Sequence, residues 1–251
     1  MKSPLKQHLA IICIALLSSS VSAQKIEIGA GASFNYNFLS KGHSEYDPRF
    51  FKTSPTLGMG LSIPVNYHYS KKVDLRTGLG FKYRTYSIYQ DNFDIPNFNA
   101  RLTNSVNFVS WEIPLLISYQ ANFIKNTKIQ YLGGVVMALN SPQMISSSSE
   151  AFGGDTGFVS VSQFSTDNLK NSLACDLYAG ISFVRYRNAV KHSQITLAFQ
   201  YGYMPLGINK ITNQASNSQT NKTFNALLKP SMSSVIVEFV RYPRWLNRHL
   251  K

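Results

Sequence analysis

The sequence predicts an all-β protein, an eight-stranded antiparallel up-and-down transmembrane β-barrel with short periplasmic turns and long extracellular loops. Three observations lead to this fold class. Stretches of alternating apolar and polar residues recur eight times, short and long connections alternate between them, and acidic residues avoid the apolar face of each stretch. Outside the extreme N-terminus the chain has no apolar run long enough for a membrane helix. A soluble β-rich domain is the alternative.

The composition excludes two further classes of protein. Of the 251 residues, 44% are hydrophobic and only 15% are charged, which is unlike a disordered chain. The two cysteines, Cys13 and Cys175, cannot form a disulfide scaffold.

The N-terminus has the features of a secretory signal peptide. Lys2 and Lys6 precede the apolar run 9–17, and Val21-Ser22-Ala23 forms a small-residue cleavage site. The apolar run is too short for a membrane anchor, which is the alternative. We therefore expect residues 1–23 to be a cleaved signal peptide, residues 24–242 to form the barrel, and residues 243–251 to be a basic C-terminal tail. The predicted location is the cell outer membrane.

The eight predicted strands each place apolar residues on one parity and small or polar residues on the other. In the first strand, for example, Phe34 and Tyr36 alternate with Asn35 and Asn37. The predicted strands are residues 26–38, 57–69, 73–84, 109–123, 129–140, 173–183, 195–203 and 235–239.

The connections alternate in length, which is typical of membrane barrels. The short turns lie near residues 70–72, 124–127 and 188–192. The long connections are residues 40–54, 91–104, 141–171 and 209–230, and the serine run 146–149 within the third is interpreted as flexible loop. Four long connections and three short turns require an even number of strands, and the smallest closed barrel has eight.

Charged residues predict an ion-pair network inside the barrel. All twelve acidic residues fall either on the inward parity of a strand or in a long connection, so none faces lipid. Antiparallel pairing of the third and fourth strands brings Glu112 opposite Lys82 and Arg84, and we expect Asp176 and Glu238 to join them. A charged catalytic or transport lumen is one interpretation. A salt-bridged plug is the preferred one, because eight strands leave room only for side chains.

The basic excess of the chain gathers at the predicted periplasmic end. The long loops are nearly neutral, so the excess does not indicate nucleic-acid binding. We expect a periplasmic basic rim that meets phosphates of outer-membrane lipids or an acidic periplasmic or membrane protein partner. Its predicted members are Arg185, Arg187, Lys191, Arg244, Arg248 and Lys251.

The sequence contains no convincing catalytic, cofactor or metal motif. His43, Ser44 and Asp47 are the only candidates for a nucleophilic site, and they share one polar loop within five residues. His68 and His192 lack a Cys, His or carboxylate partner at metal-ligand spacing. Gly-x-Gly pairs occur within strands and are not nucleotide loops. We therefore expect no enzyme activity, no cofactor and no metal.

Several strand motifs resemble a known family. Trp111-Glu112-Ile113-Pro114-Leu115-Leu116-Ile117-Ser118-Tyr119 is similar to the Glu-Ile-Pro-Leu-Leu strand of the PorT-type outer-membrane β-barrel family of Bacteroidota. The segments 75–83, 131–134 and 176–181 resemble other strands of that family. The resemblance implies an outer-membrane barrel and, for some members, a part in type IX protein secretion and gliding.

Three functions follow, in order of preference. The first is a non-enzymatic structural or interaction component of the outer membrane, related to secretion and contacting a partner through the basic rim. The second is a surface ligand-binding barrel that acts through residues 141–171 and 209–230. The third is an envelope-lipid-modifying enzyme that depends on His43 or Ser44.

Overall fold

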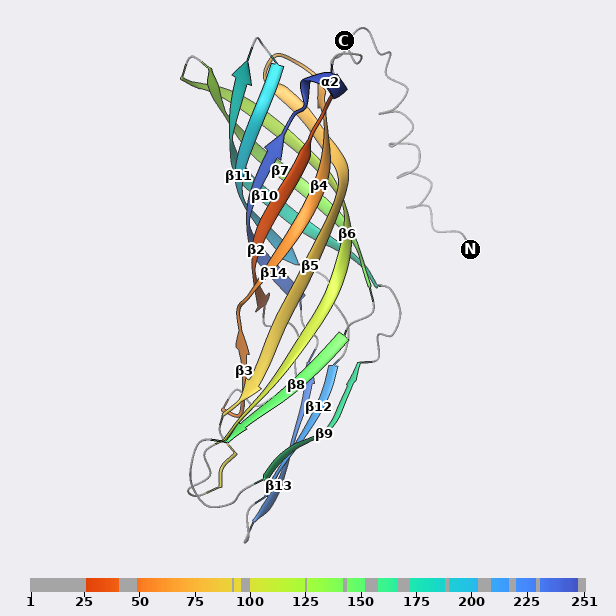
Figure 1. Ribbon diagram of the computed structural model, residues 1–251, viewed down its shortest axis with the longest axis vertical. Helices are drawn as coiled ribbons and strands as arrows, with labels where there is room; N and C mark the ends of the chain where they lie inside the picture. Colours follow the sequence, from red (N-terminus) through yellow and green to blue (C-terminus); the bar gives the residue numbers. More distant parts are fainter. Residues whose placement is uncertain are drawn as a thin grey trace, which may run out of the picture.

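Eight antiparallel strands close into a barrel in the computed structural model (Figure 1). The structure describes residues 26–40, 49–91, 93–95, 100–124, 126–141, 144–151, 158–166, 172–187, 190–202, 209–216, 220–228 and 231–247. The ring consists of β2 (Ala30–Ser40), β4 (Thr56–His68), β5 (Val73–Gln90), β6 (Ala100–Ile124), β7 (Thr127–Asn140), β10 (Ser172–Arg187), β11 (Val190–Gly202) and β14 (Ser231–Arg241). Pairing of β14 with β2 closes it. The predicted fold class is confirmed.

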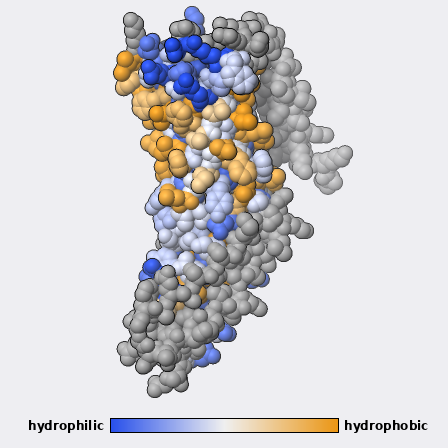
Figure 2. Space-filling view, in the orientation of Figure 1, coloured by the Kyte–Doolittle hydropathy of each residue, from blue (hydrophilic) through white to orange (hydrophobic). Residues whose placement is uncertain are grey.

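Alternation of side chains gives the barrel an apolar outer surface and a polar interior. Leu57, Leu61 and Ile63 on β4 point outward and are 55–73% exposed, which suits contact with lipid. Asn35 and Asn37 on β2 point inward and are buried. On the face of the barrel shown in Figure 2, apolar side chains form a band next to a strongly hydrophilic end. The five inward acidic residues of the strands are all buried, as their parity predicted.

The barrel continues past the apolar band into a β-structured extension. Strands β5 and β6 extend into this region, where two further strands pair with them. Strand β3 (Phe51–Ser54) pairs with β5, and β8 (Met144–Ala151) pairs with β6. A separate sheet contains β9 (Phe158–Thr166), β12 (Asn209–Ser216) and β13 (Asn221–Leu228). These elements lie together at the end opposite the C-terminus (Figure 1). We call this extension the head.

The head has a hydrophobic core of its own. Tyr86 and Ile88 of β5 and Phe108 of β6 are fully buried and belong to one cluster with Ile211 and Phe224 from β12 and β13. Phe93 packs edge-on against Phe224, with ring centroids 5.7 Å apart. Lys222 of β13 donates a hydrogen bond to Asp94 Oδ2 at 2.6 Å. The cluster therefore joins the second sheet to the extended hairpin of β5 and β6.

The prediction that the long connections are loops is wrong for much of their length. Residues 100–104 belong to β6, and the serine run 146–149 lies in β8. Residues 209–230 contain β12 and β13. Apolar side chains of β12 and β13, such as Ile211 and Phe224, are buried in the head, which is the pattern expected where water and not lipid surrounds a strand. The three predicted short turns are present, between β4 and β5, β6 and β7, and β10 and β11.

The other end of the barrel is closed by its own C-terminal residues. Strand β1 (Ile26–Ile28) pairs with β4 there, and the short helix α2 (Arg244–Asn247) follows β14. Tyr242, between β14 and α2, is buried; its hydroxyl donates to Gln194 Oε1 at 2.8 Å and accepts from Asn66 Nδ2 at 2.9 Å. No helix within the described ranges is long and apolar enough to cross a membrane. The predicted signal peptide lies outside the described residues.

Candidate functional site: a layered lumen and a basic rim

Glu112 forms the centre of an ion-pair layer nearest the head. Lys82 Nζ lies 2.7 Å from Glu112 Oε2, and Arg84 also pairs with this carboxylate. Arg84 Nη1 lies 3.7 Å from Asp176 Oδ2, and Gln200 bridges the two acids by donating to Asp176 Oδ2 at 2.8 Å and to Glu112 Oε1 at 3.2 Å. The structure thus brings together four of the five residues predicted for the lumen network.

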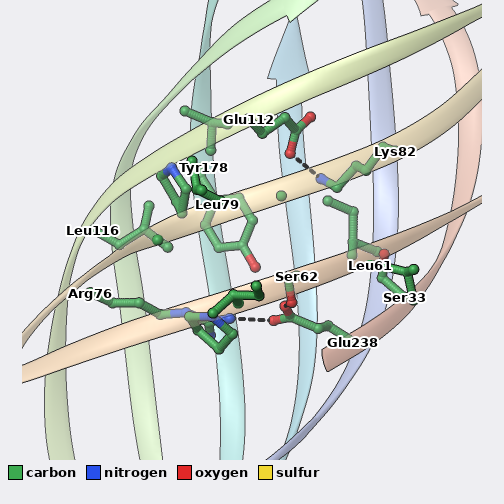
Figure 3. A pocket seen from close by; sticks show the side chains of 17 residues that line it. Ser33, Leu61, Ser62, Arg76, Leu79, Lys82, Glu112, Leu116, Tyr178 and Glu238 are labelled. Carbon is green, nitrogen blue, oxygen red and sulfur yellow. Dashed lines mark hydrogen bonds and ion pairs between the residues drawn. The ribbon is translucent and has the colours of Figure 1, made fainter. Parts of the chain in front are cut away.

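Glu238, the fifth predicted member, lies in a different layer. Its Oε2 pairs with Arg76 Nη2 at 2.6 Å, and its Oε1 accepts from Ser62 Oγ at 2.7 Å. Figure 3 shows this pair and the Lys82–Glu112 pair on opposite sides of a cavity that Tyr178 also lines. The cavity has a volume of about 50 Å³, enough for roughly three to five water molecules.

A third charged layer fills the periplasmic end of the lumen. Asp74 is fully buried and its Oδ2 lies 2.9 Å from Lys191 Nζ. His68 contacts Asp74 Oδ1 at 2.7 Å and Glu27 Oε2 at 3.1 Å. Gln120 and Gln130 also donate to Asp74 Oδ2. This layer was not predicted from the sequence. The inward parity of Asp74 and Glu27 indicated that both acids are buried, but not which bases pair with them.

Lys191 therefore does not belong to the exposed rim, and this part of the rim prediction is wrong. The pairing of β10 with β11 shifts register between Arg185 and Tyr186, so that Arg185 pairs with Ser193 and Tyr186 with Lys191. A bulge of this kind reverses the direction of side chains on one strand. Lys191 consequently turns into the lumen, where two carboxylates compensate the cost of burying its charge.

Three other predicted rim residues lie on the surface at the same end. Arg185 and Arg187 of β10 and Arg244 of α2 are exposed. Arg241 of β14, also exposed, pairs in register with Ser193 of β11. Arg248 and Lys251 lie outside the described residues, as do His43, Ser44 and Asp47 of the catalytic alternative.

The lumen alternates charged layers with apolar side chains. Leu116, Leu132, Val136 and Ile236 form a buried cluster with Tyr178 at the level of the small cavity. The head core lies beyond the Glu112 layer, because Tyr86 and Ile88 follow Arg84 along the inward face of β5. Each layer contains acids and bases in contact, so the arrangement can neutralise buried charge and fill the barrel with side chains. In the described part of the chain no group of three or more His, Cys, Asp or Glu residues could hold a metal ion.

The chain belongs to the family described as outer membrane protein beta-barrel domain, whose model matches residues 22–213. It is thus an outer-membrane β-barrel protein. No protein of curated function matches it.

Among solved structures, the chain is similar to the outer membrane protein OprG from Pseudomonas aeruginosa, with 12% identity over 88% of this chain and 96% of OprG and a TM-score of 0.42. It is also similar to Ail, the attachment invasion locus protein of Yersinia pestis, solved with a heparin analogue, with 8% identity over 87% of this chain and 99% of Ail and a TM-score of 0.31. Neisserial surface protein A is 10% identical over 87% of this chain and 97% of that protein, with a TM-score of 0.29.

Proposed function

We propose that this outer-membrane barrel is a closed, non-enzymatic anchor that presents its folded head to a binding partner outside the cell. The observation that carries the proposal is the head core, in which Ile88 and Phe108 of the barrel hairpin pack with Ile211 and Phe224 of the second sheet. Burying apolar side chains from separate segments stabilises one conformation of the head. An ordered surface loses less conformational entropy on binding than a mobile loop does.

The layered lumen supports the closed state. Along β5 the inward side chains Asp74, Arg76 and Arg84 are at most 5% exposed, and each is paired with an acid or base from another strand. A solute that passed through would have to separate these pairs in turn. Breaking a buried pair costs about 3 to 5 kcal/mol, so we expect no passage of solutes larger than water or small ions.

Site-specific crosslinking on intact cells tests the function. A photoreactive residue replaces Thr223, which is exposed on β13 of the head; a matched variant carries it in place of Arg187 at the opposite end. Crosslinks to a surface ligand or protein from position 223 are the expected result. Absence of crosslinks at position 223, in a protein that still shows heat-modifiable migration, would contradict the proposal.

A role in secretion related to that of PorT-type proteins is the second candidate. It is supported by the resemblance of the strand at residues 111–119 and by the exposed side chains of Arg185, Arg187 and Arg244. This candidate predicts crosslinks to a periplasmic or membrane protein from position 187, and their loss when the chain is truncated after Tyr242. Normal secretion and unchanged crosslinks in the truncated protein would contradict it.

A further inference from the structure

Two parallel rows of side chains cross the outer surface of β10, β11 and β14 near the periplasmic end. Phe183, Ile195 and Phe239 are paired in register across the three strands and are 46–52% exposed. Two residues further along, the next outward row contains Arg185, Ser193 and Arg241. Two residues of a strand span about 7 Å, so the row of arginines follows directly after the apolar row that faces lipid.

Two further arginines extend this row into a basic corner. Arg187 lies at the end of β10, and Arg244 lies at the start of α2 after β14. A polar hollow of about 460 Å³ adjoins Arg185, Arg187 and His192. Strongly hydrophilic side chains gather at this end of the molecule, beside the apolar band (Figure 2).

The corner carries positive charge that the described residues do not neutralise. Within the described ranges, no carboxylate forms an ion pair with Arg185, Arg187, Arg241 or Arg244. The acids at this end, Glu27 and Asp74, are buried in the lumen beside Lys191 and His68. The pKa of His192 lies below its ordinary value, because of desolvation and then because of the positive charges of Arg241, Arg187, Arg185 and Arg244.

The direction of the arginine row favours a lipid over a periplasmic protein. Arg185 and Arg241 have the same outward parity as Phe183 and Phe239, so they point sideways from the barrel wall. Phosphate groups of a leaflet lie at this level, just beyond its hydrocarbon core. Trp245 of α2, next to Arg244, is 71% exposed, and tryptophan is enriched at the membrane–water interface.

We propose that this corner binds the phosphate of an anionic phospholipid headgroup in the periplasmic leaflet. Arg185 and Arg241 contact the phosphate from the barrel wall, while Arg187 and Arg244 supply further charge from the periplasmic side. Guanidinium groups suit this ligand because their planar array of donors matches phosphate oxygens. The inference is independent of the proposed function of the head.

Lipid retention by the purified full-length protein tests the proposal. The protein in a neutral detergent is titrated with phosphatidylglycerol or phosphatidylcholine, and native mass spectrometry measures the bound lipid. Arg185→Gln combined with Arg241→Gln removes the outward row. Lys71→Gln combined with Lys72→Gln removes the same charge from exposed residues in the turn between β4 and β5. Arg185→Lys combined with Arg241→Lys keeps the charge, and heat-modifiable migration checks folding in every variant.

We expect wild type to retain phosphatidylglycerol in preference to phosphatidylcholine, and the double Gln variant at the corner to bind it roughly tenfold or more weakly. The lysine-turn variant should retain most of the binding. The charge-conserving variant should lose part of it, though less than the double Gln variant, because lysine keeps the charge but not the planar array of donors. Equal losses in the corner and turn variants would overturn the proposal, since any rim charge would then suffice. Unchanged lipid binding in the corner variant would also overturn it, and an acidic protein crosslinked at position 187 in that case would identify the corner as a protein-binding surface.

Discussion

Glu112 connects three side chains of the ion-pair layer nearest the head. Lys82 and Arg84 pair with its carboxylate and Gln200 donates a hydrogen bond to it, while only 4% of the residue is exposed. Carboxylates and guanidinium groups are rarely this buried without a partner. Removing the acid would leave Lys82 and Arg84 in the lumen without the carboxylate they share, while Asp176 stays 3.7 Å from Arg84.

Replacing Glu112 with Ala should therefore lower the free energy of unfolding by about 3 to 5 kcal/mol. Urea-induced unfolding of the protein in lipid vesicles measures the loss. The matched control is Asp91→Asn, which breaks a partly exposed pair between Asp91 and Lys52 with atoms 2.9 Å apart and should cost no more than about 1 kcal/mol. Similar losses in the two variants would show that the Glu112 layer is not a tightly packed charge network.

His192 reports on the charge of the basic corner. Desolvation and, after it, the positive charges of neighbouring guanidinium groups disfavour its protonated form, so its pKa lies below the ordinary value. Replacing Arg185 and Arg241 with Gln removes two of these positive charges, so the pKa of His192 should rise toward its ordinary value, and imidazole NMR signals followed through a pH titration measure it. An unchanged pKa would mean that desolvation alone causes the shift.

At the scale of elements, the alternation of apolar and polar residues determined how much of each strand could be predicted from the sequence. Outward apolar residues such as Leu79 and Phe81 identified the outward face of β5 correctly. The predicted register was wrong in detail, because Gly80 pairs directly with Glu112, and the longer side chains of Lys82 and Arg84 reach the carboxylate from further along β5. Beyond Arg84 the apolar residues change parity, to Tyr86 and Ile88. The pattern of a membrane strand, with apolar residues on the outward parity, therefore ends at Arg84. The strand itself continues, and the change in pattern marks the point where it passes from lipid into water.

Two other features could not be read from parity. The bulge that turns Lys191 inward depends on pairing between β10 and β11, and one strand alone does not reveal it. Arg76 on β5 meets Glu238 on β14 across the lumen, although β5 and β14 are not hydrogen-bonded neighbours. Such contacts depend on barrel closure, so the sequence pattern predicted which acids point inward but not every partner.

Gly78 of β5 has a backbone conformation that residues with a side chain rarely adopt. Its φ is +140°, and a Cβ atom there would lie 2.2 Å from the carbonyl oxygen of Ile63. Gly78→Ala should therefore destabilise the barrel by about 1 to 3 kcal/mol in urea unfolding. Gly133 is the control, because a Cβ atom there meets nothing within 4 Å. Equal effects of Gly78→Ala and Gly133→Ala would show that neither the positive φ nor the close approach of Ile63 requires glycine at position 78.

Phe224 tests whether the head is a packed element. Its ring lies 5.0 Å from that of Phe50 and 5.7 Å from that of Phe93. Phe224→Ala should loosen the head at a cost of about 3 kcal/mol, seen as faster hydrogen exchange in β12 and β13 with no change in heat-modifiable migration. Thr223→Ala, on the exposed side of the same strand, should leave exchange unchanged. Equal exchange in both variants would indicate that the head has no cooperative core.

At the scale of the whole molecule, the structure combines three environments along one axis. The head is a water-exposed β structure with an apolar core, the middle is a lipid-facing barrel with a charged interior, and the opposite end carries the basic corner. Strand β5 passes through all three, and its inward face carries Asp74, Arg76 and Arg84 within the barrel but Tyr86 and Ile88 in the head. The residue type on that face changes because lipid surrounds the barrel and water surrounds the head. A continuous path through the barrel would have to cross three charged layers and the head core.

Single-channel recording therefore tests the closed barrel most directly. The purified, heat-modifiable protein is inserted into planar lipid bilayers and current is measured at constant voltage. We expect no steady unitary conductance from wild type, because side chains fill the interior of an eight-stranded barrel. Large, steady channels from wild-type protein would contradict the closed anchor and would identify the lumen as a transport path.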